Sequence, residues 1–334
     1  MSIVKALKWF FALILALLLL LAVGSWLGSW IFLDKESQYG EAAAALPTFS
    51  NDHSSELVQI PAGEWTFRAR VAGFDNNNPK GNLILLHGFP ESSIMWEPLI
   101  KKAAADGYRV VAFDQRGYSP GARPTERDAY SAKNLVSDVL AVADKVGFDT
   151  FNLVGHDWGS VVGWQTVFTA PERVESYSAL SIPHISAIVE SFELEPELRN
   201  KSAYMAFYWL PWLPEFSLSA DDFSALRQLY NQHPAQHVAE YLAIFQAPGG
   251  LTGALNWYRG ALEGLNQPTE KVTTPTLFIW GKNDPVTSRL AVELQQNYMA
   301  GPFEVIELDS GHWIVESHPE AVTEAVMARI RSTL

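Results

Sequence analysis

The feature that most restricts the fold of this chain is a series of short apolar runs, each bounded by turn residues. Runs of this kind are typical of strands that are buried on both faces of a parallel sheet. Two further strands are predicted just before the first run, at residues 56–61 and 64–72. Strands that alternate with helices predict an α/β fold, with a mostly parallel sheet and helices on both faces. The apolar runs are residues 82–88, 108–114, 151–157, 174–182, 274–281 and 303–309.

The alternation stops between residues 185 and 266, where no run of the buried-strand type occurs. This segment is rich in helix formers and aromatic residues, which predicts a helical cap inserted after the strand at 174–182. Residues 56–184 and 267–334 then form the α/β core. Five cap aromatics lie close together in the sequence, and they could pack as the cap's own core or favour an apolar substrate that partitions into membranes. We favour the packing role for these residues, which are Phe207, Tyr208, Trp209, Trp212 and Phe216.

The first 35 residues differ from the rest, because no charged residue occurs over the 25 positions from Trp9 to Leu33. At about 1.5 Å per residue, a helix of this length crosses the roughly 30 Å hydrocarbon core of a bilayer. Lys5 and Lys8 precede the run, which predicts a cytoplasmic N-terminus and a C-terminal part in the periplasm or outside the cell. The alternative is a signal peptide cleaved near Gly24 and a secreted product. We favour a retained membrane anchor, because the apolar run continues well past Gly24.

Composition excludes several classes of function. The chain has 24 Lys and Arg against 37 Asp and Glu, so it lacks the cationic excess on which nucleic-acid affinity depends. It has no cysteine, which excludes disulfides, thiolate catalysis and cysteine-ligated metal sites. Residues 36–55 are mostly small or polar, which predicts a linker between the N-terminal segment and the core.

The segment GHDWGS, residues 155–160, resembles the sharp strand-to-helix turn that presents a catalytic serine in esterases, but Asp157 occupies the serine position. The flanking residues Gly155 and Gly159 leave room for a tight turn. A carboxylate at this position can attack carbon and form an alkyl-enzyme ester. The backbone N–H of Trp158 can then face the anion that develops when the ester is hydrolysed.

Hydrolysis of such an ester requires a general base for water, usually a histidine oriented by an acid. Asp284 follows the strand at 274–281, and His312 follows the strand at 303–309. Both would lie at the carboxyl ends of parallel strands, where Asp157 also lies. Each residue has a structural alternative: Asp284 as a turn or helix cap, His312 as a hydrogen-bonded core histidine, and Asp157 as a degenerate serine site. Their joint positions favour the catalytic interpretation.

A second loop, LLHGFPESS at residues 85–93, follows the first buried strand. Its Phe89 N–H would be the second donor to a developing anion, and the bond before Pro90 is a candidate for a cis peptide. His87 and His156 are expected to hold these loops rather than to react. His233 and His237 are spaced i, i+4, but Pro234 lies between them and no carboxylate pattern is nearby. We therefore predict neither a metal site nor a cofactor.

Several motifs together resemble the epoxide hydrolase branch of the α/β-hydrolase superfamily, over residues 56–334. They are HGFPESS (87–93), DQRGYSPGARP (114–124), GHDWGS (155–160), the loop of Asp284 and GHW (311–313). The resemblance implies an α/β-hydrolase fold with an inserted helical cap. It also implies a small apolar epoxide and water as substrates, attack by the aspartate, and two cap tyrosines that hydrogen-bond the epoxide oxygen.

The resemblance assigns the cap tyrosines to Tyr258, in the segment NWYR, and to Tyr204, with Tyr208 as the alternative for the latter. A phenol is a suitable acid here, because an alkoxide is a poor leaving group near neutral pH. The chain departs from many relatives at Tyr208-Trp209, where they carry a glutamine, and a narrower pocket is expected.

Other interpretations remain open at this point. Haloalkane dehalogenases share the two aspartates, the histidine and the tryptophan after the nucleophile, but usually carry a halide ligand where this chain has Phe89. Fluoroacetate dehalogenases resemble the chain at HGFP, but need an arginine where Trp158 stands. Another ester- or C–C-hydrolysing relative and a non-catalytic binding protein are the last alternatives, since fold alone does not determine function.

Overall fold

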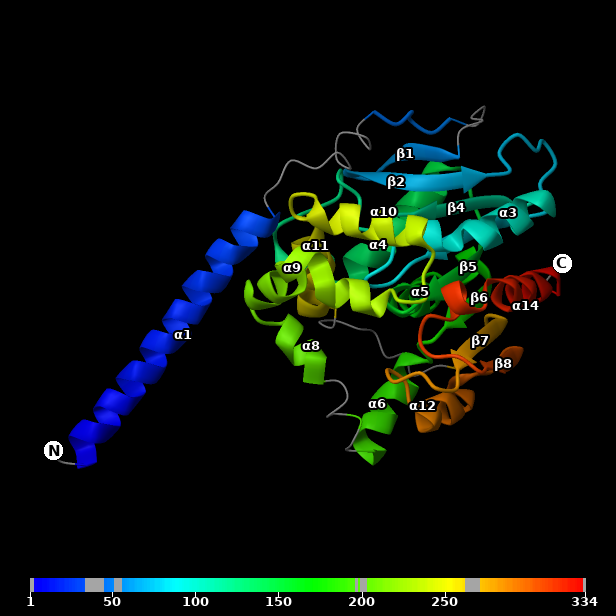
Figure 1. Ribbon diagram of the computed structural model, residues 1–334. Coiled ribbons are helices and arrows are strands. Elements are labelled where there is room, and N and C mark those ends of the chain that lie inside the picture. Colours follow the sequence, from blue (N-terminus) through cyan, green and yellow to red (C-terminus); the bar gives the residue numbers. More distant parts are fainter. Residues whose placement is uncertain are drawn as a thin grey trace.

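The computed structural model describes residues 3–33, 45–50, 56–195, 198, 203–261 and 271–332. Its central feature is an eight-stranded sheet (Figure 1). All eight predicted strands are present, with ends that differ from the predictions by at most two residues. The strands are β1 (Leu57–Ala62), β2 (Trp65–Ala72), β3 (Asn82–Leu86), β4 (Arg109–Phe113), β5 (Phe151–His156), β6 (Val174–Leu180), β7 (Thr276–Gly281) and β8 (Phe303–Leu308).

The strand order is β1-β2-β4-β3-β5-β6-β7-β8. The pairs β1–β2 and β2–β4 are antiparallel, and the pairs from β4 to β8 are parallel. The mostly parallel sheet is therefore confirmed. The connection from β3 to β4 runs toward one edge of the sheet, and all later crossovers run toward the other edge. Because crossovers are right-handed, the helix of the first connection lies on one face of the sheet and the helices of the later connections lie on the other.

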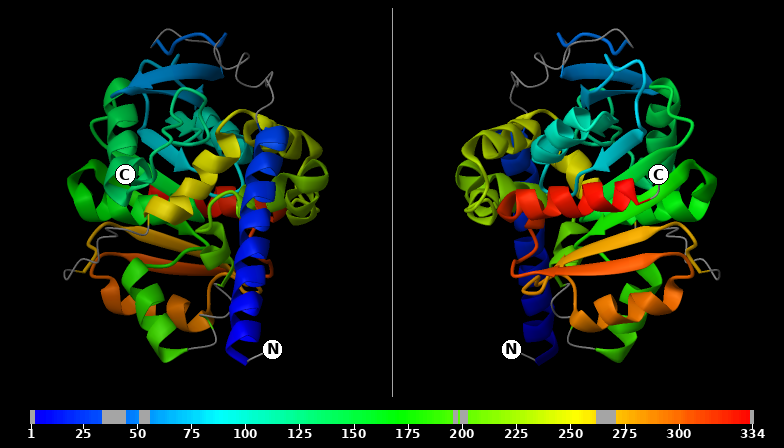
Figure 2. Two further views of the ribbon diagram at one scale, coloured as in Figure 1. Left: turned by 90° about the vertical axis from the view of Figure 1, so that its left-hand side faces the viewer. Right: turned by 90° about the vertical axis from the view of Figure 1, so that its right-hand side faces the viewer.

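Helices accordingly cover both faces of the sheet (Figure 2). Helix α3 connects β3 to β4 and packs against α14 on one face, while α4 and α5 pack together on the other. Helix α12 connects β7 to β8. The bounds of these helices are α3 (Glu97–Ala105), α4 (Ala132–Lys145), α5 (Trp158–Thr169), α12 (Arg289–Leu294) and α14 (Pro319–Arg331), with the short α13 (Ile314–Ser317) before α14.

The hydrophobic core lies along the central strands. Every residue of β5 and of β7 is buried, as expected for strands covered on both faces. Strand β8 forms one edge of the sheet, and its Glu304 and Glu307 form ion pairs with Arg329 and Arg289 at the surface. Charged residues on an edge strand oppose pairing with another chain.

The predicted run of cap helices lies between β6 and β7 and covers the carboxyl ends of the strands. Its helices are α6 (Ile185–Leu194), α8 (Ala203–Tyr208), α9 (Leu213–Leu229), α10 (Ala235–Gln246) and α11 (Gly250–Asn256), followed by a π-helical turn at Trp257–Ala261. The C-terminal limit predicted for the cap, residue 266, lies outside the described residues. The expectation that all five cap aromatics form the cap's own core is wrong for two of them, because Trp209 and Trp212 are exposed.

Helix α1 (Ile3–Leu33) projects from the globular part and contacts α9 near its attachment (Figure 1). The stretch Leu7–Leu27 is long and apolar enough to cross a membrane, and its leucines are largely exposed. Of the predicted linker, residues 45–50 are described, and they lie against the sheet. Phe49 is buried, its N–H donates to the carbonyl of Gln59 at 2.8 Å, and its ring packs edge-on against Phe74.

Candidate active site

Asp157 occupies the turn between β5 and α5 with φ 52° and ψ −122°, a conformation that costs a residue other than glycine about 1–3 kcal/mol. The turn is tight because glycines flank it. A Cβ on Gly155 would lie 2.3 Å from the carbonyl oxygen of Gly159, and one on Gly159 would lie 2.1 Å from that of Leu86. The two small residues are therefore required by close backbone approach, and the turn lifts the Asp157 carboxylate above the sheet.

The structure brings His312 and Asp284 to this carboxylate, as the sequence predicts. His312 Nε2 lies 3.4 Å from Asp157 Oδ2, and His312 Nδ1 lies 2.8 Å from Asp284 Oδ2. The other oxygen of Asp284 accepts a hydrogen bond from the N–H of Val286 at 2.7 Å. Asp284 is not the cap of α12, a position that Ser288 takes. The carboxylate, the imidazole and the second carboxylate thus form one continuous chain of contacts.

Two backbone positions can donate to an anion formed at Asp157. The N–H of Phe89 donates to Asp157 Oδ1 at 2.9 Å, and the Phe89–Pro90 bond is cis, as predicted. Trp158 begins α5, so its N–H belongs to the first turn, where helical N–H groups have no partner within the helix. A Cβ on Gly88 would lie 2.4 Å from Asp157 Oδ1, so only glycine allows this approach of the two loops.

A cavity of about 200 Å³ opens from Asp157 into the cap. Asp157, Trp158, Tyr204 and Tyr258 line it, whereas Tyr208 is not among its lining residues. The ring centres of Tyr204 and Tyr258 are 6.4 Å apart, and Trp158 meets Tyr258 edge-on at 5.0 Å. The rest of the lining is mainly aliphatic, with Ile182, Ile185, Ile188, Val189 and Met205.

The electrostatics of the cavity keep the phenols protonated and the imidazole charged. Desolvation and the nearby Asp157 carboxylate raise the pKa of both Tyr204 and Tyr258 above the ordinary value. Burial disfavours a charge on His312, but the carboxylates of Asp284 and Asp157 outweigh burial and raise its pKa well above 6.5. The cavity is therefore lined by two protonated phenols and by the carboxyl group of Asp157.

A buried ion pair beneath the turn was not foreseen from the sequence. His156 Nδ1 lies 2.9 Å from Glu91 Oε2, and its Nε2 lies 3.0 Å from the carbonyl oxygen of His312. Burial disfavours a charged His156, but Glu91 outweighs that effect and raises the pKa of His156. Both ring nitrogens can then donate, which holds the backbone of His312 to the loop after β3. The sequence feature that could have indicated this pair is Glu91, two residues after Phe89 in the loop at residues 85–93.

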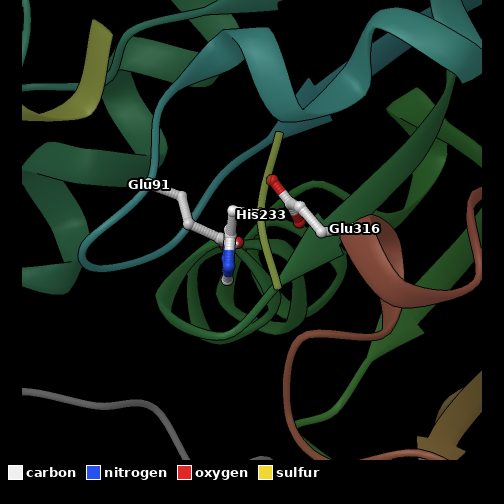
Figure 3. Close-up of side chains that lie close together, drawn as sticks. All are labelled: Glu91, His233 and Glu316. Atoms are coloured by element: carbon white, nitrogen blue, oxygen red, sulfur yellow. Dashed lines mark ion pairs between the residues drawn. The ribbon is translucent and has the colours of Figure 1, made fainter. Parts of the chain in front are cut away.

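The sequence spacing predicts no carboxylate near His233. This prediction is wrong, because the fold brings two carboxylates next to it. Glu91, His233 and Glu316 each offer a ligand atom, and these atoms lie within 4.8 Å of one another (Figure 3). Glu91 already pairs with His156, and Tyr241 donates to Glu316 at 2.6 Å. One oxygen of each carboxylate, Glu91 Oε2 and Glu316 Oε1, therefore has a protein partner that is distant in sequence.

His87 uses both ring nitrogens to join loops. Its Nδ1 lies 3.0 Å from the carbonyl oxygen of Gly88, and its Nε2 accepts from the N–H of Gln115 at 3.0 Å. Burial lowers the pKa of His87, so the ring is neutral and suited to one donated and one accepted bond. This geometry agrees with the structural role expected for it.

The strand order and the turn after β5 define the class, which is the α/β hydrolases. The model of the alpha/beta hydrolase fold family matches residues 81–319. The chain is 32% identical over 256 residues to epoxide hydrolase 4 of Homo sapiens, covering 73% of this chain and 70% of that protein. It is 33% identical to the AB hydrolase superfamily protein YfhM of Bacillus subtilis, covering 75% and 90%.

A solved epoxide hydrolase of Bacillus megaterium, in complex with its diol product, superposes with a TM-score of 0.73. The two chains are 24% identical over 82% of this chain and 99% of that one, a likeness that speaks for the fold alone. The chain belongs to the alpha/beta hydrolase fold family, in its epoxide hydrolase branch, and is a hydrolase.

Proposed function

We propose that the protein hydrolyses an epoxide to a vicinal diol through a covalent ester of Asp157. The single observation that carries this proposal is the placement of one carboxylate and two phenols, those of Tyr204 and Tyr258, around the same cavity. A carboxylate nucleophile alone would suit several reactions. Two O–H donors opposite it suit a substrate whose leaving oxygen must be protonated.

In the first step, an Asp157 oxygen attacks an epoxide carbon and the carbon–oxygen bond of the ring breaks. The released oxygen takes a proton from Tyr258 or Tyr204. The raised pKa of both phenols keeps the proton available at neutral pH. Donors that are already in position need no reorganisation as charge develops on the oxygen.

In the second step, His312 takes a proton from water, and the water oxygen attacks the carbonyl carbon of the ester. The tetrahedral anion would be stabilised by the N–H groups of Phe89 and Trp158. It collapses with release of the diol, whose oxygen takes the proton from His312. The proton left on the regenerated Asp157 carboxyl group then returns to the tyrosinate. Esterification removes the charge of Asp157, one of the two carboxylates that raise the pKa of His312, so His312 becomes a base only after the ester forms.

Haloalkane dehalogenation is the alternative that the same carboxylate would support. A halide leaves as a stable anion and needs no proton donor, so the two phenols would have no role in that reaction. Its usual ligand, the indole of Trp158, lies edge-on against the ring of Tyr258. The geometry therefore favours the epoxide over the haloalkane.

The test uses the full chain in detergent with styrene oxide as substrate. We expect diol from the wild type, none from Asp157→Ala, and in His312→Gln an adduct of the epoxide's mass on a peptide that contains Asp157. Diol formation by Asp157→Ala, or a His312→Gln protein that stays free of adduct, would refute the ester. Halide release from a haloalkane without diol formation would move the assignment to the dehalogenase.

We further propose that α1 remains part of the protein as a membrane anchor, with the N-terminus in the cytoplasm and the α/β core on the other side. Support comes from the apolar stretch Leu7–Leu27 and from Lys5 and Lys8 on its N-terminal side.

A further inference from the structure

The exposed apolar side chains of the globular part are concentrated on the cap. Among the described residues outside α1, eight large apolar side chains are exposed, and seven of them belong to the cap. Isolated exposed apolar residues are ordinary, but a concentration of them marks an interaction surface. We define the cap face by these seven residues, which are Val189, Leu194, Tyr204, Trp209, Leu210, Trp212 and Leu229.

One part of the cap face lies next to the helix that α1 contacts. Residues 209–212 lead directly into α9, the helix that α1 contacts. In both Figure 1 and Figure 2, the N-terminal end of α1 lies at the same level as α6, at the lower end of the molecule. A bilayer that surrounds Leu7–Leu27 would therefore meet the cap before it meets the sheet.

The cavity that contains Asp157 opens through this same face. Val189 on α6 and Tyr204 on α8 both line the cavity, and they are also 36% and 39% exposed. A residue that is both lining and exposed marks the mouth of a cavity. The mouth is thus bordered by apolar surface, and the aliphatic lining continues that surface inward.

We propose that the cap face docks on the lipid bilayer and that the cavity takes its substrate from the lipid. This inference rests on the proposed function and specifies its substrate class, which is an epoxide on a long hydrocarbon chain dissolved in the membrane. Tryptophan suits the boundary of a bilayer, because its ring is apolar and its N–H can contact the polar headgroups. Trp209 and Trp212 take that place on the cap face.

The first test reads the position of the cap face relative to lipid. Because the chain has no cysteine, Leu210→Cys gives a single site for a nitroxide label on the otherwise unchanged full chain. Val305→Cys on β8 is the matched control, since Val305 and Leu210 are apolar and 38% and 44% exposed. In phospholipid nanodiscs we expect the label at 210 to be accessible to oxygen and protected from a water-soluble nickel complex, and the label at 305 to show the reverse.

Equal accessibility of the two labels to the nickel complex would overturn the docking. Strong dipolar coupling between labels at 210 would also overturn it, because a second copy of the chain would then cover the cap face. Both readings are independent of turnover, so they separate failure of the docking from failure of the proposed function.

The second test reads the route of the substrate. The pair Trp209→Ser and Trp212→Ser, with Val305→Ser as control, is assayed on styrene oxide in solution and on a long-chain epoxy ester in phosphatidylcholine vesicles. We expect turnover of the vesicle substrate to fall about tenfold, or about 1.4 kcal/mol of surface binding, with styrene oxide turnover unchanged. Unchanged turnover of both substrates would overturn the route, whereas inactivity of the wild type on both would instead refute the proposed function.

Discussion

Asp157 is held by its surroundings rather than by its own conformational preference. Its N–H donates to the carbonyl of Leu180 at 3.3 Å, and its carboxylate accepts from the N–H of Phe89 at 2.9 Å. A strained backbone persists when neighbouring contacts over-determine it, and such strain is concentrated at functional sites. Removal of the carboxylate takes away one of these two contacts and leaves the backbone bond to Leu180.

Tyr258→Phe removes one O–H donor and keeps the ring that packs against Trp158. We expect ester formation to slow about tenfold to a hundredfold, because general-acid assistance is worth about 10²–10⁴ and Tyr204 retains part of it. The rate at which the adduct appears in the His312→Gln background measures this step. Tyr208→Phe is the matched control, and a larger loss there than in Tyr204→Phe would assign the first cap tyrosine to Tyr208.

Hydrolysis of the ester should slow as pH falls, because only neutral His312 can take a proton from water. The Asp284 carboxylate raises the pKa of His312, so the wild type loses the neutral form at a higher pH than an isolated imidazole would. Asp284→Asn removes that charge and should move the midpoint of the pH dependence of ester hydrolysis to lower pH. It should also slow ester hydrolysis on the order of a thousandfold, because His312 loses the partner that holds its correct tautomer. The rate of adduct decay in single-turnover experiments, measured across pH, reports both effects. An unchanged midpoint would contradict the expected change in the pKa of His312.

At the scale of elements, the cap and the sheet are joined by a buried ionic cluster. Glu240 on α10 binds Arg68 and Arg70 on β2, each through two hydrogen bonds of 2.7–3.1 Å. Arg68 also pairs with Asp114 at 2.8 Å. Periodicity predicts α10 as a helix, but the partner of Glu240 is about 170 residues away, so local pattern does not identify it.

Glu240→Gln leaves two arginines at the junction without their shared carboxylate. We expect the free energy of unfolding to fall by about 3 kcal/mol, because removal of one partner leaves buried charge uncompensated. Glu307→Gln is the control, since its two-bond pair with Arg289 lies at the surface, where such a pair is worth about 1 kcal/mol or less. The free energy of unfolding of each variant is measured by urea titration in the same detergent. Equal losses of unfolding free energy in the two variants would show that the junction does not depend on this cluster.

For the whole molecule, α1 continues without interruption from Ile3 to Leu33. Cleavage near Gly24 would divide it, and the remaining apolar residues would then be exposed to water. We expect the intact mass of the protein isolated from membranes to include the N-terminal segment, and alkaline carbonate to leave it in the membrane fraction. A mass that lacks residues 1–24, with release into the soluble fraction, would establish a cleaved signal peptide.

The sequence by itself determined the strands, the mostly parallel sheet and the insertion of a helical segment after β6, because these follow from local periodicity and from the chirality of crossovers. It also predicted that Asp157, Asp284 and His312 lie together, since residues that follow parallel strands meet at one edge of the sheet. Only the tertiary structure decided which side chains meet elsewhere: Glu91 with His156, Glu240 with two arginines of β2, and Tyr204 rather than Tyr208 on the cavity wall. It also decided that Trp209 and Trp212 are exposed. These contacts join segments far apart in the chain, and local periodicity does not specify which side chains meet across the fold.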